Sequence, residues 1–159
     1  MRRLLCAFSV LWLFRVWPAF VAGADVTTLL GIEGFHVEIG MISKAARTLG
    51  VDESRLRLLA AERLRRASLV VGDFPAILVI SLRTIEHPTT VIAYCLEVEV
   101  RQVMHLARTE QMQMLAPTWA TGTLTMVTQT SFIRSVEDAL AALLDQLVRD
   151  YRLVNETPK

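Results

Sequence analysis

Two glutamates in the middle of the chain are the first candidates for chemistry, because they stand two residues apart. Glu97 and Glu99 fall on the same face of any β-strand that contains them, which brings their carboxylates close together. Such a pair can act as general acid and general base when a cleft raises one of the two pKa values. The neighbouring Arg101 instead indicates an open, solvated face on which these groups form cross-strand ion pairs.

The histidines do not have the spacing of a metal site. His36, His87 and His105 are single and far apart in the sequence, whereas zinc ligands usually occur in closely spaced pairs. A site would need dispersed residues to converge, for instance His36 and Glu38 with His105. The chain also lacks phosphate-loop, GxGxxG and GxSxG motifs. We therefore expect no catalytic residue, no cofactor and no metal, and a hydrolase or metal enzyme is the least favoured class.

The first 24 residues have the three regions of a secretory signal peptide. Two arginines make the positive start, Leu4 to Phe14 the apolar core, and Ala22 to Ala24 an A-x-A cleavage motif. Arg15 and Pro18 interrupt the apolar run, which favours a cleaved signal over a retained membrane anchor. We predict that residues 1–24 are removed and that the protein is exported, to the periplasm of a Gram-negative-type bacterium or to the medium.

The composition predicts a folded globular chain. Apolar residues make up 53% of the sequence and charged residues 21%, which is enough apolar material for a core. The 17 basic and 16 acidic residues nearly cancel, so we expect no nucleic-acid partner and no charge-driven binding to an anionic membrane surface. Cleavage would leave Cys95 as the single cysteine, which excludes an internal disulfide. We expect this residue to be a half-buried filler rather than a reactive thiol.

The longest two-residue alternation in the chain runs from Thr90 to Arg108 and predicts one long β-strand. Glutamates and Arg101 fall on its solvated face. The same parity assigns these apolar residues to the buried face: Ile92, Tyr94, Leu96, Val98, Val100, Met104 and Leu106. Because such a strand is long for a small protein, we expect a bulge or bend near Gln102.

The rest of the mature chain predicts further strands and two covering helices. The expected strands are Phe35–Ile42, with Val37, Ile39 and Met41 on one face, Leu69–Val71, Ala76–Glu86 and Ala116–Thr130. A polar connection from Ser43 to Gly50 leads to the first helix, which is capped by Asp52. The second helix begins near Ser131, or one turn later if Ser135 and Asp138 form a capping box. Ile133 is expected in the apolar stripe of this second helix.

The order β-α-β-β-β-β-α predicts an α+β two-layer sandwich. A mixed sheet of four to five strands is covered on one face by two helices. We expect one domain from residue 25 to 155 and a disordered tail from 156 to 159. No integral membrane segment is expected after signal cleavage, and the sequence leaves the oligomeric state open.

Trp119 shares a strand face with threonines rather than with aliphatic residues. A tryptophan has an apolar body with a polar N–H, which suits a surface that binds a partner. We take Trp119, Thr121 and Thr123 as the candidate surface for a partner or ligand. The alternative is that Trp119 packs against the second helix or seals the end of the sheet.

Three stretches resemble an uncharacterised family of small exported bacterial proteins. They are A-P-T-W-A-T-G from Ala116 to Gly122, the helix end D-Q-L-V-R-D-Y-R-L-V-N from Asp145 to Asn155, and V-E-V-R-Q from Val98 to Gln102. The family combines an A-x-T-W-x-x-G strand with a C-terminal D-Y-x-x-V-N helix, and the resemblance implies no activity or site residues. More loosely, the element order is similar to the N-terminal domain of TolB and to the lipopolysaccharide-assembly lipoprotein.

The leading functional hypothesis is a non-catalytic binding or envelope-assembly accessory module, whose partner is an envelope protein. The alternative is a carrier of a small apolar ligand or lipid. For a carrier, these residues would line the cavity: Trp119, Met104, Met112, Met114 and Met126. The segment from Ala107 to Pro117 matches neither a strand nor a loop pattern and is a candidate binding loop.

Overall fold

The structure is a computed structural model that describes residues 25–86, 91–106 and 109–156. The predicted signal peptide, the turn at His87 and residues 157–159 lie outside the described residues. The chain forms η1 (Val26–Leu29), β1 (His36–Ile42), α1 (Lys44–Thr48), α2 (Glu53–Arg66), β2 (Ile77–Glu86), β3 (Val91–Leu106), β4 (Thr109–Thr128), η2 (Gln129–Ser131) and α3 (Phe132–Asn155).

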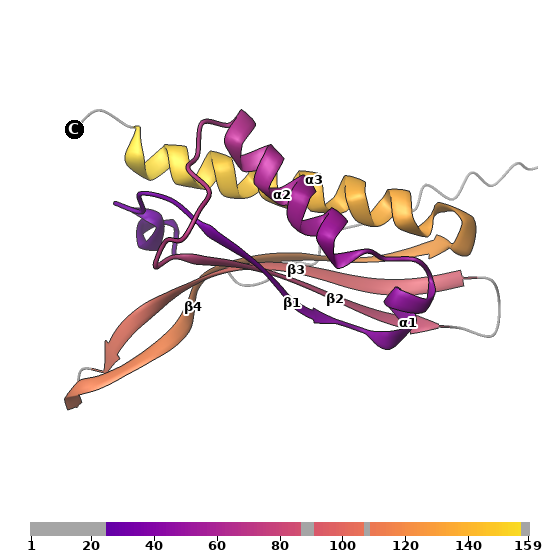
Figure 1. Ribbon diagram of the computed structural model, residues 1–159, viewed down its shortest axis with the longest axis horizontal. Helices are drawn as coiled ribbons and strands as arrows, with labels where there is room; N and C mark the ends of the chain where they lie inside the picture. Colours follow the sequence, from indigo (N-terminus) through magenta and orange to yellow (C-terminus); the bar gives the residue numbers. More distant parts are fainter. Residues whose placement is uncertain (1–24, 87–90, 107–108, 157–159) are drawn as a thin grey trace, which may run out of the picture.

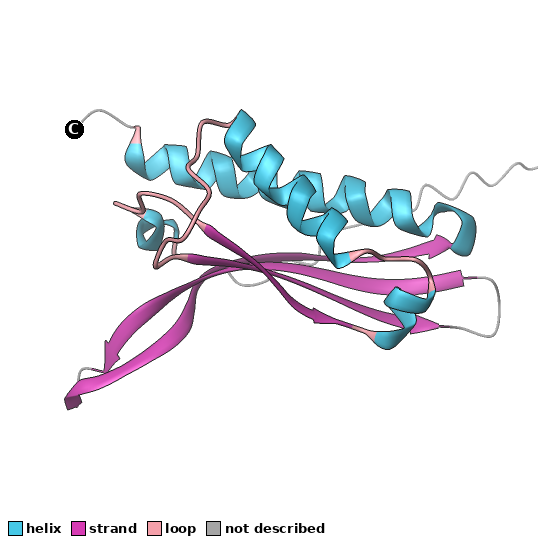
Figure 2. Ribbon diagram, in the orientation of Figure 1, coloured by secondary structure: helices cyan, strands magenta, loops and turns pink. Residues whose placement is uncertain are grey.

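Four strands make one mixed sheet in the order β1-β2-β3-β4. β1 runs parallel to β2, and the other neighbours are antiparallel. The helices α2 and α3 lie side by side across one face, while the described helices leave the other face open (Figures 1 and 2). The α+β two-layer sandwich is therefore confirmed. Leu69–Val71 is not a strand, since only an isolated bridge joins Val71 to Phe35.

The alternation in β3 places its apolar residues in the core as predicted. Ile92, Tyr94, Leu96, Val98 and Val100 are all buried on the helix side of the sheet. Burial of these side chains against α2 and α3 provides most of the driving force for folding. The bulge expected near Gln102 is confirmed as a register shift between Val100 and Arg101.

A bulge in β1 reverses one prediction. The register of β1 on β2 shifts between Ile39 and Ile42, so that Ile42 is buried and Met41 is exposed, not on the face of Val37. The following segment is not a plain connection, because Ser43 accepts a hydrogen bond from the backbone N–H of Ala46 and begins α1. The predicted start of α2 is confirmed, with the Asp52 carboxylate accepting from the N–H of Ser54 at 2.8 Å.

The helix α3 begins at Phe132, so the later capping box at Ser135 is not formed. Phe132 is fully buried in edge-to-face contact with Tyr94, at a ring-centroid distance of 5.7 Å. Ser135 instead binds the Tyr94 hydroxyl, which lies 2.8 Å from its Oγ atom. This position rotates Ile133 out of the buried stripe to the exposed flank of the helix.

An ion pair joins the two covering helices. Arg63 of α2 donates from Nε to Asp145 Oδ1 of α3 at 2.7 Å, and both side chains are about 40% exposed. The hydrogen bond from Arg63 lowers the pKa of the Asp145 carboxyl below its usual value. Because water screens such a pair, its contribution to stability is about 0.5–1 kcal/mol.

We expect Asp145→Asn to lower the free energy of unfolding by about 0.5–1 kcal/mol at pH 7. Since the folded pKa lies below the unfolded value of about 3.9, the difference is fully present above that pH and is lost as the pH falls through the folded pKa. Urea denaturation at pH 7 and pH 3 measures it. The control is Asp138→Asn, whose partner Arg134 is on the same helix and highly exposed. An equal cost for both variants would contradict the helix-joining role.

The β3–β4 hairpin continues past the end of β2 as a projecting arm (Figure 1). We define the arm as residues 102–106 and 109–117, because β2 pairs with β3 only as far as Arg101. The segment from Thr109 to Pro117 is thus strand, not a binding loop. Met104 is exposed although its parity matches that of buried Val100, because the arm bends away from the helices (Figure 1).

Candidate binding surface on the open face of the sheet

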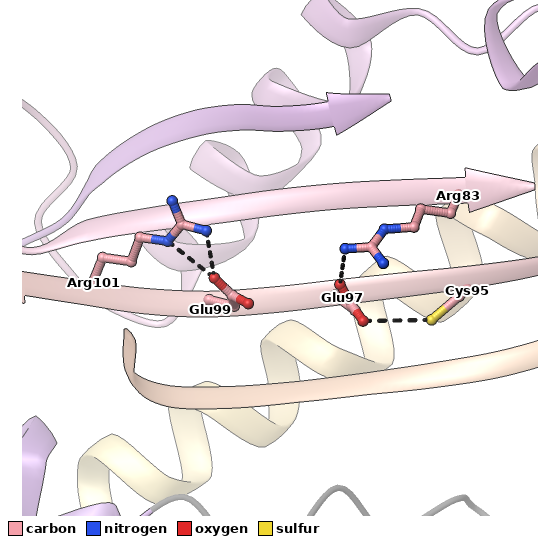
Figure 3. A network of polar contacts seen from close by, with 5 residues as sticks. All are labelled: Arg83, Cys95, Glu97, Glu99 and Arg101. Carbon is pink, nitrogen blue, oxygen red and sulfur yellow. Dashed lines mark hydrogen bonds and ion pairs between the residues drawn. The ribbon is translucent and has the colours of Figure 1, made fainter. Parts of the chain in front are cut away.

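The centre of the open sheet face carries a row of charged side chains (Figure 3). Glu97 of β3 pairs with Arg83 of β2 at 3.6 Å, which confirms the predicted cross-strand ion pair. Glu99 pairs along its own strand with Arg101, whose Nη2 and Nε atoms lie 2.8 and 3.0 Å from one carboxylate oxygen. Each glutamate therefore has its own guanidinium partner on the open face of the sheet, an arrangement that suits recognition rather than proton transfer.

Cys95 lies in the same row, with its Sγ atom 3.7 Å from Glu97 Oε1. Burial raises the pKa of the Cys95 thiol, and the nearby Glu97 carboxylate raises it further, against an opposing effect of Arg83. The thiolate is the reactive form, so this environment makes the cysteine a weak nucleophile at neutral pH.

We expect Cys95 to react slowly with iodoacetamide at neutral pH, and Glu97→Gln to accelerate the reaction severalfold by removing a negative neighbour. Mass spectrometry of the Cys95 peptide over time measures the rate. The matched control is Glu99→Gln, which changes a carboxylate on the same face that pairs with Arg101 and not with Cys95. If both substitutions accelerate the reaction equally, the cause is a general change in the strand and not the contact with Glu97.

Beyond the charged row, large apolar side chains gather at one end of the open face. Ile85, Leu124 and Met126, which we call the apolar patch, are 73%, 59% and 70% exposed. The register brings them together, because Ile85 and Met126 are both opposite Ala93, and Leu124 is opposite Cys95. Clustered exposed side chains of this size are typical of interaction surfaces. The patch was not predicted; the alternation of Leu124 and Met126 with threonines in β4 is its local signal in the sequence.

Trp119 lies in the core, which contradicts its assignment to an exposed surface for a partner or ligand. The side chain is 2% exposed, and its Nε1 donates to Asp150 Oδ2 of α3 at 3.0 Å. Thr121 donates to Gln146 of the same helix at 3.0 Å, and Thr123 shares a hydrogen bond with Thr125. The alternative prediction, that Trp119 packs against the second helix, is confirmed, because α3 covers this face of β4.

The residues that a dispersed metal site would need do not converge in the part of the chain that the structure describes. His36 lies at the start of β1 with Nδ1 3.3 Å from the Gly72 carbonyl, whereas His105 lies on the projecting arm. Among residues 25–86, 91–106 and 109–156, no group of three His, Cys, Asp or Glu side chains has the geometry of a metal site. The described residues therefore give a metal enzyme no support.

The methionines proposed to line a carrier cavity are dispersed. Met104, Met112 and Met114 are exposed on the arm, Met126 belongs to the apolar patch, and Trp119 is in the core. A hollow of about 310 Å³ does exist at the base of the arm, but other residues line it: Leu30–Gly34, Phe74–Ala76, Gln102 and Val103.

The fold and its open face define the class of protein as a two-layer α+β module with an uncovered sheet surface. None of the described helices is both long and apolar enough to span a membrane. No protein-family model and no curated protein matches the sequence.

Two solved structures are similar in shape. A minor lipoprotein from Acinetobacter baumannii is 10% identical, with a TM-score of 0.44 over 78% of this chain and 93% of that chain. A predicted lipoprotein from Caulobacter crescentus is 15% identical, with a TM-score of 0.41 over 86% of this chain and 100% of that chain. Because both TM-scores are below 0.5, neither likeness says what this chain does. The looser resemblance to TolB and lipopolysaccharide-assembly modules stays a prediction.

Proposed function

We propose that this protein is a non-catalytic, exported binding module of the bacterial envelope, which binds a protein partner through the open face of its sheet. The observation that carries the proposal is the apolar patch, where Ile85 of β2 and Leu124 and Met126 of β4 are exposed on either side of β3. The predicted signal peptide supports export, and the absence of a recognisable catalytic motif in the sequence favours binding over catalysis.

The chemistry of the face favours a protein partner. Stable protein interfaces have an apolar centre bordered by polar and charged groups, with arginine enriched. The apolar patch is bordered in this way by the Arg83–Glu97 pair, which carries both signs of charge. A nucleic acid would require a predominantly basic surface, whereas the charged row on the open face pairs each arginine with a glutamate. The partner is therefore expected to bring an apolar centre and its own mixed charges.

Site-specific photo-crosslinking in the native cells tests the proposal. A photoreactive residue at position 126 is expected to give a discrete crosslinked protein, and one at position 58 is not. Leu58 is a matched control because it is also an exposed apolar residue, 53% exposed, but belongs to α2 on the covered side. A photoreactive residue at position 85 is expected to give the same crosslinked protein. The double variant Leu124→Glu with Met126→Glu should reduce this crosslink by about tenfold or more, since it places charge in the centre of the interface.

Two outcomes would contradict the proposed function. A crosslink that persists unchanged in the double variant would show that the apolar patch is not the contact. A crosslink to lipid alone, or a ligand co-purifying in equal amount and lost on changing the hollow at Gln102 and Val103, would favour the carrier instead.

A further inference from the structure

The base of the projecting arm presents an unpaired strand edge. β2 begins at Ile77, and its pairing with β3 ends at Arg101, whereas β3 and β4 stay paired along the arm (Figure 1). Among the described residues, no strand therefore lies on the β2 side of residues 102–106. The chain before β2 turns toward β1 instead, because the Ala76 carbonyl accepts from the N–H of His36 at 2.9 Å. Such an edge offers its backbone N–H and C=O groups to an added strand.

The hollow of about 310 Å³ lies directly beside this edge. Gln102 and Val103 both line it, and consecutive residues of a strand point to opposite faces. A space that touches both residues is therefore next to the strand and not above one of its faces. Pro75, which also lines the hollow, stands where a longer β2 would face Val103, and it has no N–H to pair with β3. A strand added beside residues 102–106 would fill the space that β2 leaves.

The walls of the hollow are held by contacts within the protein. The Tyr151 hydroxyl of α3 donates to the Ile32 carbonyl at 2.8 Å and fixes one wall. The Phe74 ring packs closely on Gly34, where a β-carbon would lie 2.6 Å from its Cε2 atom. A site whose walls are already fixed loses little conformational entropy when a ligand binds. The hollow is therefore preformed.

The size and charge of the hollow indicate its occupant. Its apolar lining includes Leu30, Ile32, Phe74 and Val103. A volume of about 310 Å³ is at the lower limit for sites that enclose a small molecule, about 300–1,000 Å³, and it suits an anchoring side chain. Glu33 adds to the lining an exposed carboxylate that forms no ion pair with another described residue. This charge favours an occupant that brings a lysine or an arginine.

We propose that the arm binds an extended segment of another protein, which adds as a strand beside residues 102–106. A large apolar side chain of that segment fills the hollow, and a lysine or arginine faces Glu33. The unpaired edge calls for an extended backbone, which neither a lipid nor a small apolar ligand has. This site is separate from the apolar patch, because Ala93, which that patch flanks, is about 33 Å from Val103 along β3.

Fluorescence anisotropy tests the proposal with the protein purified from its own cells, with whatever N-terminus export leaves. The probe is a short fluorescein-labelled peptide that alternates valine with threonine around a central leucine and has a lysine near each end. Val103→Asn should weaken binding by about tenfold or more, because it places an amide in the apolar lining. The matched control is Leu115→Asn, since Leu115 is directly opposite Val103 on β4, is 47% exposed against 51%, and does not line the hollow. An equal loss for both variants would contradict the site.

The attraction between the probe and Glu33 is tested separately. Glu33→Gln should weaken binding about threefold at low salt and remove most of its salt dependence, because salt screens the pairing of this carboxylate with lysine. Glu38→Gln is the matched control, since Glu38 is also exposed but lies in β1 and does not line the hollow. Equal affinities for the two variants would show that the carboxylate at position 33 does not select a basic segment.

The backbone contacts are tested with two analogues of the peptide, N-methylated at its odd or at its even positions. In a strand added to one edge, alternate N–H groups face the sheet and the others face water. One analogue should therefore lose about tenfold or more in affinity, and the other less than about threefold. Equal losses for the two analogues overturn strand addition.

Two further results would overturn the proposal. One is the absence of binding at about 1 mM peptide. The other is binding of N-acetyl-leucine amide as tight as that of the peptide, which would make the hollow a site for small molecules. The double variant Leu124→Glu with Met126→Glu should bind the peptide normally, because neither residue lines the hollow. Failure of peptide binding and failure of crosslinking at the apolar patch are therefore independent results.

Discussion

Replacing Val98 by aspartate is expected to abolish cooperative folding, whereas replacing its neighbour Glu99 by alanine is expected to cost less than about 1 kcal/mol. Val98 is fully buried at the middle of β3, between Ile80 of β2 and Thr121 of β4. A carboxyl group buried there without a partner costs several kcal/mol. That penalty is comparable to the whole stability of a small folded chain, about 5–15 kcal/mol.

Circular dichroism during urea denaturation measures both variants. Val98→Asp should show no folded baseline at neutral pH, and Glu99→Ala should unfold cooperatively with a slightly lower midpoint. Removing Glu99 breaks only its partly exposed ion pair with Arg101, so the expected cost is that of one surface ion pair. A cooperative transition for Val98→Asp, or an equal decrease in the free energy of unfolding for both variants, would contradict the assignment of Val98 to the buried face of β3 and Glu99 to the open face.

The same alternation explains how much of the fold was predictable. A period of two fixes which side chains share a face, so the buried row from Ile92 to Val100 and the charged row of Glu97 and Glu99 follow from sequence order alone. Helix start residues act locally as well, and Asp52 capped α2 as expected. These features depend on neighbours within a few residues.

Features that depend on distant segments were missed. The period of two in β3 places Met104 on the same face as buried Val100. It does not tell where the helices stop covering that face, and Met104 lies beyond this point and is exposed. Threonines around Trp119 suggested solvent, whereas α3, more than a dozen residues later in the chain, covers that face. The apolar patch arises from the register of β2, β3 and β4, which no single stretch of sequence specifies.

Trp119→Ala is expected to lower the free energy of unfolding by about 3–5 kcal/mol, the usual cost of deleting a buried large aromatic side chain. The indole is 2% exposed between β4 and α3. Its removal leaves a cavity at the place where the final helix joins the edge of the sheet. Circular dichroism at increasing urea concentration gives the change without relying on tryptophan fluorescence.

Trp119→Phe separates packing from hydrogen bonding at the same position. Phenylalanine keeps most of the apolar volume but removes the N–H that donates to Asp150, whose side chain is partly exposed and can bind water instead. We therefore expect a smaller loss of about 1–2 kcal/mol. If alanine and phenylalanine cost the same, the hydrogen bond and not the packing would hold α3 against β4. If neither substitution changes the free energy of unfolding, the contact between Trp119 and α3 contributes nothing to stability.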